Sequence, residues 1–465
     1  MPLIRNFGRN VRFTPKRSYE PRTDEDVLRI LRDHRGGRIR CIGALHSWSR
    51  IVEAHDVIVD LRHFDSVGVV TKGMDPGHEG AQVRLGGGCT IQRALDILAA
   101  EGLTLPTIGA ITAQTVAGAI STGTHGSGSQ SLSHFVEEVR LAGYDPDSGE
   151  PAILRLRGRD ELLAARCALG GLGVILDVVL RARGVYRIEE EFAKVESAEA
   201  AMAGRKEWPL QQFFLMPWKW RYYVYRRKPT DELPRRASAL WRRLVLFIFI
   251  DVAQHALLKG FVLPLAWALG DWVCRLFLRA TPIGGYRRID DSRHVLTLRH
   301  DLFRHVEMEV FVPEGRLPEA MNSVRALIEF AAGQRAAFPD EDKQLEATYP
   351  VLRRTWTHHY PVSFRYVLPE ETLISMASKR CEKDQEAWVA ISFFSYRRPD
   401  NAAFARFAAV VAAHLVGKYG ARLHWGKFFP RDFSGAANAY GDNFRRFEAV
   451  RSRYDRAGVF WIENL

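Results

Sequence analysis

The chain has 465 residues, of which 47% are hydrophobic and 26% charged, a globular composition at a length that predicts two domains rather than one core. Its 66 Lys and Arg residues outnumber 54 Asp and Glu residues, and the net charge of +12 favours anionic ligands such as phosphates. The basic residues are scattered, and neither a zinc-finger spacing nor an RNA-binding aromatic signature occurs, so nucleic acid is disfavoured as a partner.

The cysteines and the N-terminus indicate the compartment. Five cysteines lie far apart without a CxxC pair, so we expect neither a disulfide framework nor a metal site. The N-terminal sequence MPLIRNFGRNVRFTPKRS is basic but lacks the apolar run and cleavage site of a secretory signal. We therefore expect a cytoplasmic protein.

Residues 1–185 alternate short β-rich runs with Gly-bearing turns and helices, which is typical of an α+β or α/β domain. A helix is expected to begin at Thr23, because three acidic residues follow it where the helix dipole favours them. A second helix is expected at residues 90–101. Strands are expected at residues 38–42, 57–61, 82–85, 136–143, 152–157 and 173–182.

Residues 186–425 contain fewer glycines and more aromatic residues, so we expect a second domain there. Alternating segments at residues 305–313, 361–368 and 388–396 predict an antiparallel sheet. Helices are expected at residues 317–332 and 401–419. Residues 426–465 are expected to return to the first domain.

One apolar segment, residues 237–279, does not fit an ordinary domain. It contains LVLFIFI at 244–250 and an uncharged run at 260–270, both shorter than the roughly 18 to 20 residues of a membrane span. Asp251, Gln254, His255 and Lys259 recur at helical spacing, which predicts a polar stripe on an apolar helix. The segment is thus either an interfacial helix that contacts a membrane surface or a pair of helices packed over the second domain.

Three Gly-rich segments carry the strongest local signals. The first, RCIGALHSWS at residues 40–49, is a strand followed by a tight turn whose backbone N–H groups suit a pyrophosphate. The second, residues 103–128, is small and hydroxylic for over twenty residues, and the third is the cluster at 170–173. None completes a GxGxxG motif after a strand, and no P-loop occurs, so a nicotinamide Rossmann site and a nucleotide triphosphatase are disfavoured.

In this order the segments resemble the vanillyl-alcohol oxidase type of FAD-linked oxidases, in the branch of aldonolactone and alditol oxidases. The resemblance runs nearly end to end: NFGRNVRFTP at 6–15, GALHSWS at 43–49, LGGGCTIQRALDIL at 85–98, residues 103–128, GGLGV at 170–174 and HWGK at 424–427. It implies a two-domain α+β fold of the FAD-binding PCMH type. Residues 1–185 would form the FAD domain and residues 186–425 an antiparallel-sheet substrate domain, or cap.

The resemblance also implies the cofactor site. In this family the His of the first turn bonds covalently to the flavin, and here that residue is His46. Leu45 stands where the family usually has glycine, which we expect to crowd the flavin edge. The residues implied to line FAD are Gly43, Ala44, Leu45, His46, Ser47, Gly109, Ala110, Thr115, Gly118, Thr122, Gly123, His125, Gly126, Gly173, Val174 and Ile175.

On the substrate side the resemblance places Arg365 and Lys427 at the flavin face. A fixed cation there stabilises the anionic reduced ring, and Arg365 could fix a substrate oxygen. Ser363 occupies the position of a usual acidic residue and Phe393 that of the His of alditol oxidases. Because an unpartnered buried hydroxyl costs about 1 to 3 kcal/mol, a smaller or more lipophilic alcohol is favoured over a polyol as the substrate.

The leading hypothesis is hydride transfer from a CH–OH group of a small alcohol or lactone to flavin N5, with dioxygen as acceptor and hydrogen peroxide as product. Gly109, which the resemblance places near the oxygen-reacting edge, favours an oxidase. The proton acceptor is open among His424, His125, a tyrosine and water. Two alternatives are a membrane-associated dehydrogenase that reduces a quinone or cytochrome and a non-catalytic flavin-binding module.

Overall fold

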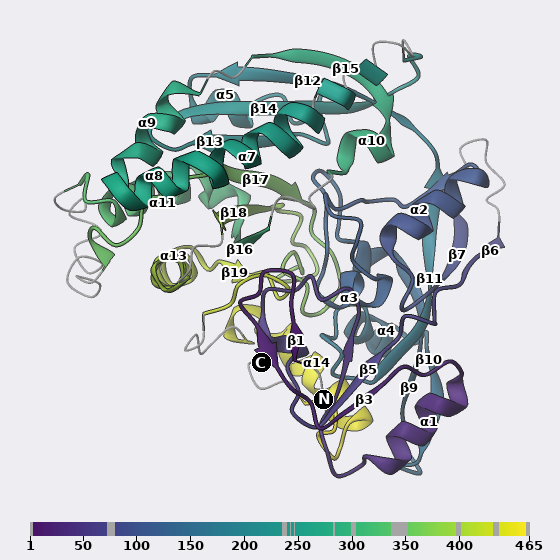
Figure 1. Cartoon of the computed structure of the whole chain (residues 1–465). Helices are drawn as coiled ribbons and strands as arrows, with labels where there is room; N and C mark the ends of the chain where they lie inside the picture. Colours follow the sequence, from purple (N-terminus) through teal and green to yellow (C-terminus); the bar gives the residue numbers. More distant parts are fainter. Residues whose placement is uncertain are drawn as a thin grey trace.

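The computed structural model describes residues 3–71, 80–234, 240–241, 243–245, 247–281, 284–298, 304–335, 352–396, 401–430 and 437–461. Figure 1 shows two parts lying side by side: an N-terminal part with small sheets and helices, and a larger sheet with helices along one side. The larger sheet corresponds to the expected cap and is called the cap sheet below.

The N-terminal part contains three sheets. A two-stranded antiparallel sheet consists of β1 (Ile4–Arg5) and β2 (Arg12–Phe13). A parallel sheet has the order β3 (Arg17–Tyr19), β5 (Val57–Asp60) and β4 (Ile39–Ile42). An antiparallel sheet has the order β10 (Pro151–Leu156), β9 (Val136–Tyr144), β11 (Val174–Gly184), β7 (Ala81–Gly86) and β6 (Val67–Thr71), with β8 (Leu103–Thr104) paired to β11.

Two helices of this part begin after hydroxyl caps, of which the one at Thr23 was predicted. Helix α1 (Asp24–Asp33) starts after Thr23, whose Oγ1 accepts the N–H of Asp26 at 3.1 Å while the Asp26 carboxylate accepts the N–H of Thr23. Helix α2 (Ile91–Ala100) starts after Thr90, whose Oγ1 accepts the N–H of Arg93 at 3.2 Å. The expected helices and strands of residues 1–185 are therefore confirmed.

Further short helices complete the N-terminal part and the cap. They are η1 (Arg50–Val52), α3 (Val116–Ser121), η2 (Leu132–Phe135), α4 (Arg159–Ala165), α5 (Ala198–Met202), α10 (Ser292–Leu296) and η5 (Glu314–Arg316).

The cap sheet has eight strands, and all its pairings are antiparallel, as expected. Its order is β15 (Tyr286–Asp291), β12 (Arg187–Val195), β14 (Arg221–Thr230), β13 (Gln212–Met216), β17 (Val362–Val367), β18 (Trp388–Tyr396), β16 (His305–Pro313) and β19 (Arg422–Leu423). Helices α11 (Leu317–Ala331) and α13 (Ala402–Tyr419) lie along it (Figure 1). The predicted strands and helices of this region are confirmed.

The two faces of the cap sheet differ in chemistry, because successive side chains of a strand point to opposite faces. One face contributes Phe364, Ile391 and Phe393 to a core that also contains buried residues of α11 and α13. The other face carries Glu309, Ser392 and Ser363, which lie opposite one another on three adjacent strands. Polar side chains therefore gather on the face that the helices leave open.

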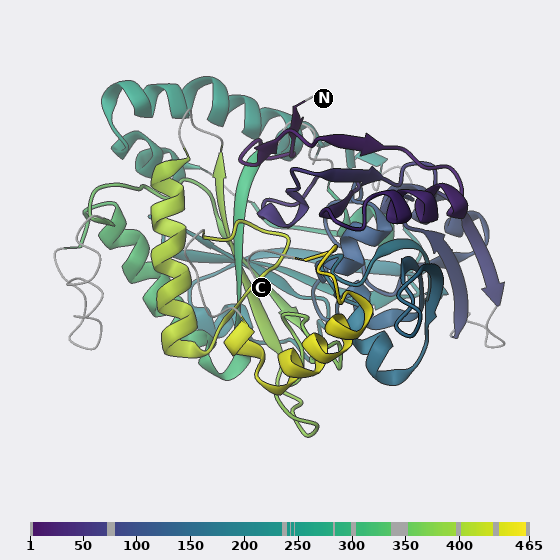
Figure 2. The ribbon, with the colours of Figure 1, turned by 90° about the horizontal axis from the view of Figure 1, so that it is seen from below.

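A helical segment follows β14 at the outer edge of the cap. It consists of η3 (Phe247–Ala253), α7 (Gln254–Leu257), η4 (Leu258–Val262), α8 (Leu263–Leu269) and α9 (Trp272–Ala280). Figures 1 and 2 show it along the periphery of the molecule. None of the helices in the described residues is both long and apolar enough to cross a membrane.

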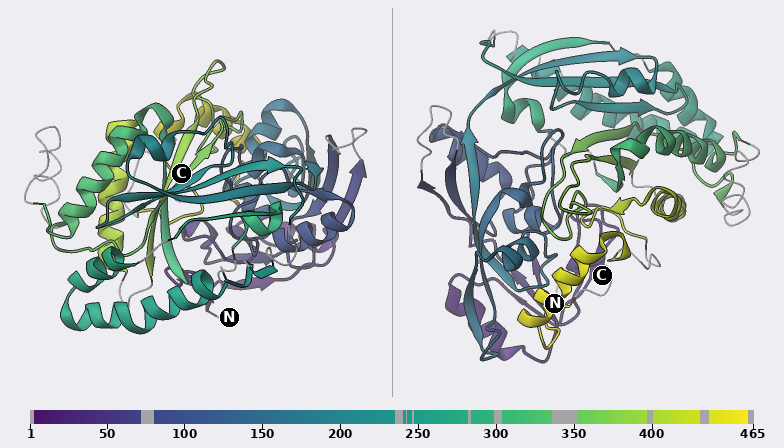
Figure 3. Two further views of the ribbon diagram at one scale, coloured as in Figure 1. Left: turned by 90° about the horizontal axis from the view of Figure 1, so that it is seen from above. Right: turned by 180° about the vertical axis from the view of Figure 1, so that it is seen from behind.

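The C-terminal residues lie against the N-terminal part. Helix α14 (Asp442–Tyr454) follows η8 (Ala437–Tyr440) and packs against α4 (Figures 2 and 3). Beyond it, the carbonyl oxygen of Val459 accepts the N–H of Ile39 at 2.9 Å. The two ends of the chain thus meet at β4.

Candidate functional site

A cleft is lined by residues of four segments: 40–61, 87–122, 169–175 and 424–427. These segments include the three Gly-rich runs and the HWGK turn of the sequence. The cleft brings together twelve of the predicted site residues: Gly43, Ala44, Leu45, His46, Ser47, Thr115, Gly118, Thr122, Gly173, Ile175, His424 and Lys427.

The turn after β4 forms one wall of the cleft. Leu45 adopts φ +55°, a left-handed conformation that favours glycine, which explains the glycine that the family usually has there. Within the described residues, the backbone N–H groups of Ala44, Leu45 and Ser47 have no hydrogen-bond acceptor. Consecutive N–H groups in such a turn form a concave site for an anion.

Two glycines hold the walls of the cleft close together. A Cβ on Gly43 would lie 2.0 Å from Thr115 Oγ1, and one on Gly173, which adopts φ +142°, would lie 2.5 Å from the carbonyl oxygen of Ala142. Side chains are therefore excluded at both positions. A flat or phosphorylated ligand can approach the backbone closely in a cleft of this kind.

Arg40 is a cleft residue that our sequence reasoning missed. Its guanidinium donates hydrogen bonds to the carbonyl oxygens of Ile51, Leu169 and Phe460, at 2.8, 2.5 and 3.2 Å. Burial lowers its pKa to about 10, so the group remains charged at neutral pH. The cleft therefore contains a buried positive charge, and a basic residue inside an otherwise apolar strand was the signal for it.

His46 lies half-buried at the cleft, and its ring contacts Phe7 edge to face with a centroid distance of 4.7 Å. The N–H of Phe7 donates to the carbonyl oxygen of Leu45 at 2.8 Å. The N-terminal segment thus positions the turn that carries this histidine.

Six predicted cofactor residues are not among the residues that line the cleft: Gly109, Ala110, Gly123, His125, Gly126 and Val174. Val174 is wholly buried in a core cluster with Ala142 and Tyr144, so its side chain supports the fold beneath the cleft. A Cβ on Gly123 would lie 2.9 Å from Met376 Cε, and one on Gly126 would lie 2.9 Å from the carbonyl oxygen of Ile108. These two glycines permit close packing.

Two buried carboxylates on β16, Glu307 and Glu309, adjoin the cleft and were also missed. Lys427 Nζ lies 2.5 Å from Glu307 Oε2 and 3.9 Å from Glu309 Oε2, and it sits over the ring of Trp48 at 4.7 Å. The expected cation therefore lies at the cleft, where Glu307 holds it in an ion pair. The signal in the sequence was the alternation of charge in His-Val-Glu-Met-Glu at 305–309.

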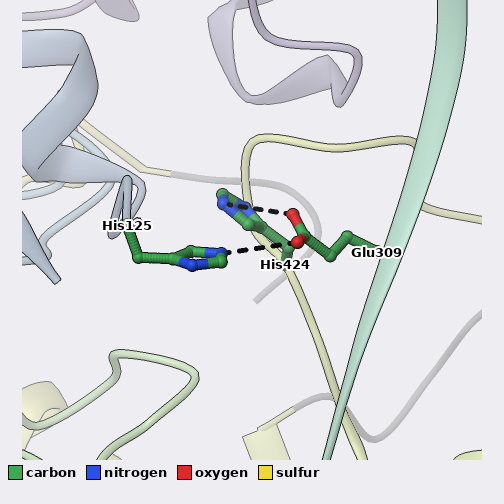
Figure 4. A group of neighbouring side chains, drawn as sticks. All are labelled: His125, Glu309 and His424. Carbon is green, nitrogen blue, oxygen red and sulfur yellow. Dashed lines mark ion pairs between the residues drawn. The ribbon is translucent and has the colours of Figure 1, made fainter. Parts of the chain in front are cut away.

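Glu309 connects the cap sheet to the N-terminal part through His125. Figure 4 shows the rings of His125 and His424 directed at its carboxylate, with Nε2 to oxygen distances of 3.4 and 3.9 Å. His125 Nδ1 donates to the carbonyl oxygen of Gly126 at 2.9 Å, which leaves Nε2 to face the carboxylate. This contact links the two parts of the molecule.

These three side chains are close enough to hold a metal ion, but their protons do not fit one. The N–H of Gly426 donates to His424 Nδ1 at 3.0 Å, so the ring proton of a neutral His424 sits on Nε2, the atom that faces Glu309. A metal ligand needs a lone pair at that atom. With Lys427 also facing Glu309, the arrangement is one of ion pairs.

The charges of this cluster follow from its surroundings. Burial alone would raise the pKa of Glu309, but the facing His125, Lys427 and His424 together hold that pKa well below its ordinary value. Burial lowers the pKa of His424 to about 3, so this ring is neutral at physiological pH. Glu309 is thus a buried, ionised carboxylate next to the cleft.

Ser363 and Arg365 lie on the polar face of the cap sheet. Ser363 Oγ accepts a hydrogen bond from Gln212 Nε2 at 3.0 Å, and Gln212 Oε1 accepts one from Arg227 at 3.3 Å. Arg227 is paired in turn with buried Glu190. Arg365 Nε is buried and has no hydrogen-bond partner within the described residues, so it is available to a substrate oxygen.

The interpretation of Phe393 as a missing polar partner at the site was wrong. Its ring is fully buried on the helix-covered face of the cap sheet, where it contacts His358 and Phe407. Its neighbours Ser392 and Phe394 lie on the polar face instead. Because side chains of a strand alternate between faces, an offset of one residue moves a side chain to the opposite face.

Comparisons with known proteins agree with this geometry. Residues 15–145 match the family described as FAD binding domain, and residues 195–465 match the family described as D-arabinono-1,4-lactone oxidase. A long-chain alcohol oxidase from an uncultured marine euryarchaeote is 38% identical over 98% of this chain and 95% of its own length. The L-gulono-1,4-lactone dehydrogenase of Mycobacterium tuberculosis is 24% identical over 99% of this chain and 97% of its own length.

The fold is also similar to that of solved structures. A solvent-stable cholesterol oxidase superposes with a TM-score of 0.70 at 14% identity, covering 98% of this chain and 95% of that one. The cholesterol oxidase from B. sterolicum gives a TM-score of 0.69, also at 14% identity, with the same two coverages. The turn of free N–H groups, the glycine walls and buried Arg40 fit the diphosphate and flat ring of FAD. The chain therefore belongs to the D-arabinono-1,4-lactone oxidase family and is an FAD-dependent oxidoreductase with the two-domain fold expected from its sequence.

Proposed function

We propose that this protein is an oxidase of lipophilic primary alcohols. The observation that carries the proposal is the composition of the polar face of the cap sheet around Arg365. Ser363, which replaces an acidic residue, lies opposite Phe214, and Phe394 follows two residues after the facing Ser392. This face offers a guanidinium for one oxygen and aromatic surface for a hydrocarbon chain, with few partners for the hydroxyls of a polyol.

The name of one relative supports this choice. The relative that is 38% identical over nearly the whole chain is a long-chain alcohol oxidase, whereas the lactone dehydrogenase is 24% identical. When bound in the cleft, FAD would supply the hydride acceptor for the alcohol carbon and would pass the electrons to dioxygen, with hydrogen peroxide as product. The residues of the chain bind and orient the alcohol, hold charge near the ring and accept the proton.

Three residues have distinct proposed roles. Arg365 fixes the substrate oxygen through its free Nε. Lys427, held by Glu307, places a positive charge at the cleft where the reduced ring becomes anionic. Glu309 orients the two histidines whose Nε2 atoms face its carboxylate, His125 and His424, at 3.4 and 3.9 Å. Ser363 and His424 position this set, through Gln212 and Glu309 respectively.

The substrate proposal is tested by anaerobic reduction of the bound flavin. Straight-chain primary alcohols of increasing length, polyols and aldonolactones are compared by stopped-flow absorbance. Because burial of one CH₂ group contributes about 0.8 kcal/mol, kcat/KM is expected to rise roughly two- to fourfold per carbon. Faster reduction by lactones or polyols contradicts the proposal, and reduction by none of the panel favours the flavin-binding module.

A covalent bond between His46 and the flavin is a second part of the proposal. Its support is the position of His46 at the cleft, on a turn that the family uses for this linkage. After acid denaturation, the yellow colour is expected to remain with the polypeptide of the wild type and to separate from His46→Ala. Colour that stays with the variant shows that the linkage is elsewhere.

The electron acceptor distinguishes the oxidase from a dehydrogenase that reduces a quinone or cytochrome. The exposed apolar helices at the edge of the cap keep that alternative open, because such acceptors are reached at a membrane. We expect turnover with dioxygen to equal or exceed turnover with an artificial dye. A rate with dioxygen that is far below the dye rate favours the dehydrogenase.

A further inference from the structure

The helical segment at the edge of the cap exposes an unusual amount of apolar surface. Of the eighteen large apolar side chains that are exposed in the described residues, twelve lie between residues 240 and 276. We call these twelve the apolar face: Leu240, Trp241, Leu244, Phe247, Ile248, Leu257, Phe261, Leu265, Trp267, Leu269, Trp272 and Leu276. Scattered exposed apolar residues are ordinary, but a cluster of this size marks an interaction site.

The opposite side of the same helices is apolar as well. Leu258, Val262, Ala266 and Cys274 are buried in a cluster that includes Tyr396 of β18. Of the polar stripe that the sequence predicted, His255 is only 4% exposed and contacts the Tyr396 hydroxyl, whereas Lys259 is exposed. A helix that is apolar all round is normally covered on every side, whereas this one is covered on one side only by the described residues.

We propose that the apolar face docks on the surface of an anionic lipid bilayer. Trp267 and Phe261 are 89% and 70% exposed, and aromatic side chains are enriched at the boundary between lipid and water. Residues 240–281 contain five basic and two acidic residues, and the whole chain carries +12. A basic, aromatic, peripheral helix of this length lies in the interface rather than spanning it.

The docked side of the cap is connected to the cofactor cleft through aromatic rings in contact. Tyr396, which packs under the helices, contacts Tyr360 at a centroid distance of 5.6 Å, and Tyr360 contacts Phe394 at 5.5 Å. Phe394 then contacts His305 at 5.5 Å, His305 contacts Phe7 at 6.0 Å, and Phe7 contacts His46.

A row of mostly buried ring contacts thus joins the bilayer side to the site. A lipophilic alcohol, which partitions into bilayers, reaches the enzyme from that side. This last step rests on the proposed function, whereas docking itself does not.

The experiment compares the full-length holoenzyme with Phe261→Gln/Leu265→Gln/Trp267→Gln in sedimentation with vesicles. Two kinds of vesicle are compared: pure phosphatidylcholine, and phosphatidylcholine with about 30% phosphatidylglycerol. In the second kind about one lipid in three carries a negative charge. We expect the wild type to bind the anionic vesicles. Binding is expected to weaken at 0.5 M salt, because the Debye screening length is then only about 4 Å. The triple variant is expected to bind at least tenfold more weakly.

A matched control carries Leu233→Gln and Leu298→Gln, two exposed apolar side chains outside the apolar face. It is expected to bind like the wild type. Equal binding by the triple variant, or no binding by the wild type, overturns the proposal. A wild-type dimer that becomes monomeric in the triple variant also overturns it, because a second copy of the chain then covers the face.

Activity separates this proposal from the proposed function. The triple variant is expected to oxidise a short, water-soluble alcohol at the wild-type rate and a long-chain alcohol carried in vesicles at least fivefold more slowly. If no alcohol reduces the flavin but vesicle binding follows the expected pattern, the substrate assignment fails and the docking surface stands. If both alcohols are oxidised equally by both proteins in the presence of vesicles, the apolar face does not deliver substrate and this step is overturned.

Discussion

Single residues at the cleft carry both strain and charge. Leu45 holds a left-handed backbone conformation at φ +55°, and its side chain packs against the buried cluster that contains Val11, Phe13 and Ile42. A residue other than glycine in this conformation costs on the order of 1 to 3 kcal/mol. The contacts of the side chain and the hydrogen bond from Phe7 to its carbonyl oxygen offset that cost.

Substitutions at Leu45 test this balance. Leu45→Gly is expected to change the unfolding free energy by less than about 1 kcal/mol, because relief of strain offsets lost contacts and backbone entropy. Leu45→Val keeps an apolar side chain but adds β-branching, and it is expected to destabilise the protein by about 1 to 3 kcal/mol. Thermal unfolding midpoints of the two variants measure the difference. A Leu45→Val variant that is as stable as the wild type contradicts the inference that the backbone is strained at this position.

The buried Glu309 makes the stability of the folded protein depend on pH, in a direction that its pKa determines. Its folded-state pKa lies below its unfolded value, so its contribution to stability is present above the unfolded pKa of about 4.3 and is lost as pH falls below it. Glu309→Gln removes this contribution, since a neutral amide replaces the buried carboxylate that His125 and Lys427 face, and is expected to cost about 3 to 5 kcal/mol at neutral pH. The difference in unfolding midpoint between wild type and variant is expected to be largest near neutral pH and to shrink on acidification. A difference that stays constant down to about pH 3 rules out this coupling.

At the scale of elements, sequence reasoning was accurate where local patterns decide the structure. The capped helices α1 and α2 and the strands β9, β16 and β18 were predicted because hydroxyl caps and side-chain alternation are local signals. Ten strands were not predicted. Six of them, β1, β2, β3, β6, β8 and β19, are short, and tertiary pairing rather than propensity creates them. The other four, β12, β13, β14 and β15, form one half of the cap sheet.

Side-chain direction could be predicted less well than secondary structure. The cleft residues at 43–47, 115–122 and 173–175 followed from the resemblance and the glycines. The orientation of Phe393 and His255 depends on which neighbour covers each element, and the charge cluster around Glu309 joins residues more than 100 positions apart. One sequence contains no signal for such contacts.

The close approach of the β4 turn to α3 provides a test at this scale. Gly43→Ala would place a methyl group 2.0 Å from Thr115 Oγ1 and is expected to lower the unfolding midpoint and the FAD content of the purified protein. Gly36→Ala is the matched control, since its Cβ would have nothing within 4 Å. The double variant Gly43→Ala/Thr115→Ala is expected to recover part of the unfolding midpoint, because the clashing hydroxyl is absent. Equal behaviour of the two single variants contradicts the packing argument.

At the scale of the whole molecule, the cofactor part is completed by the C-terminus. Asp455 accepts the N–H groups of Val459 and Phe460 at 2.8 and 3.0 Å, and these two residues are buried beside β4. The Phe460 carbonyl oxygen in turn accepts from Arg40, a cleft residue. The FAD cleft therefore depends on residues far outside the segment that matches the FAD binding domain.

A truncation measures this dependence. Deletion of residues 455–465 removes Val459 and Phe460 and leaves the guanidinium of Arg40 without one of its carbonyl acceptors. We expect loss of most bound FAD and a lower unfolding midpoint, although residues 15–145 are intact. Deletion of residues 462–465 alone is the control and is expected to retain FAD. A truncated protein with full FAD content shows that the C-terminal contact is dispensable.

The hydrogen bonds that join Val459 and Phe460 to β4 have a consequence for biosynthesis. A ribosome releases the N-terminal half first, and domains commonly fold in that order. Here the hydrogen bonds of Ile39 and Arg40 form only after Val459 and Phe460 have been added, 420 residues later in the chain. Nascent chains stalled before Val459 would therefore lack a finished cleft, and cofactor loading is expected to be post-translational.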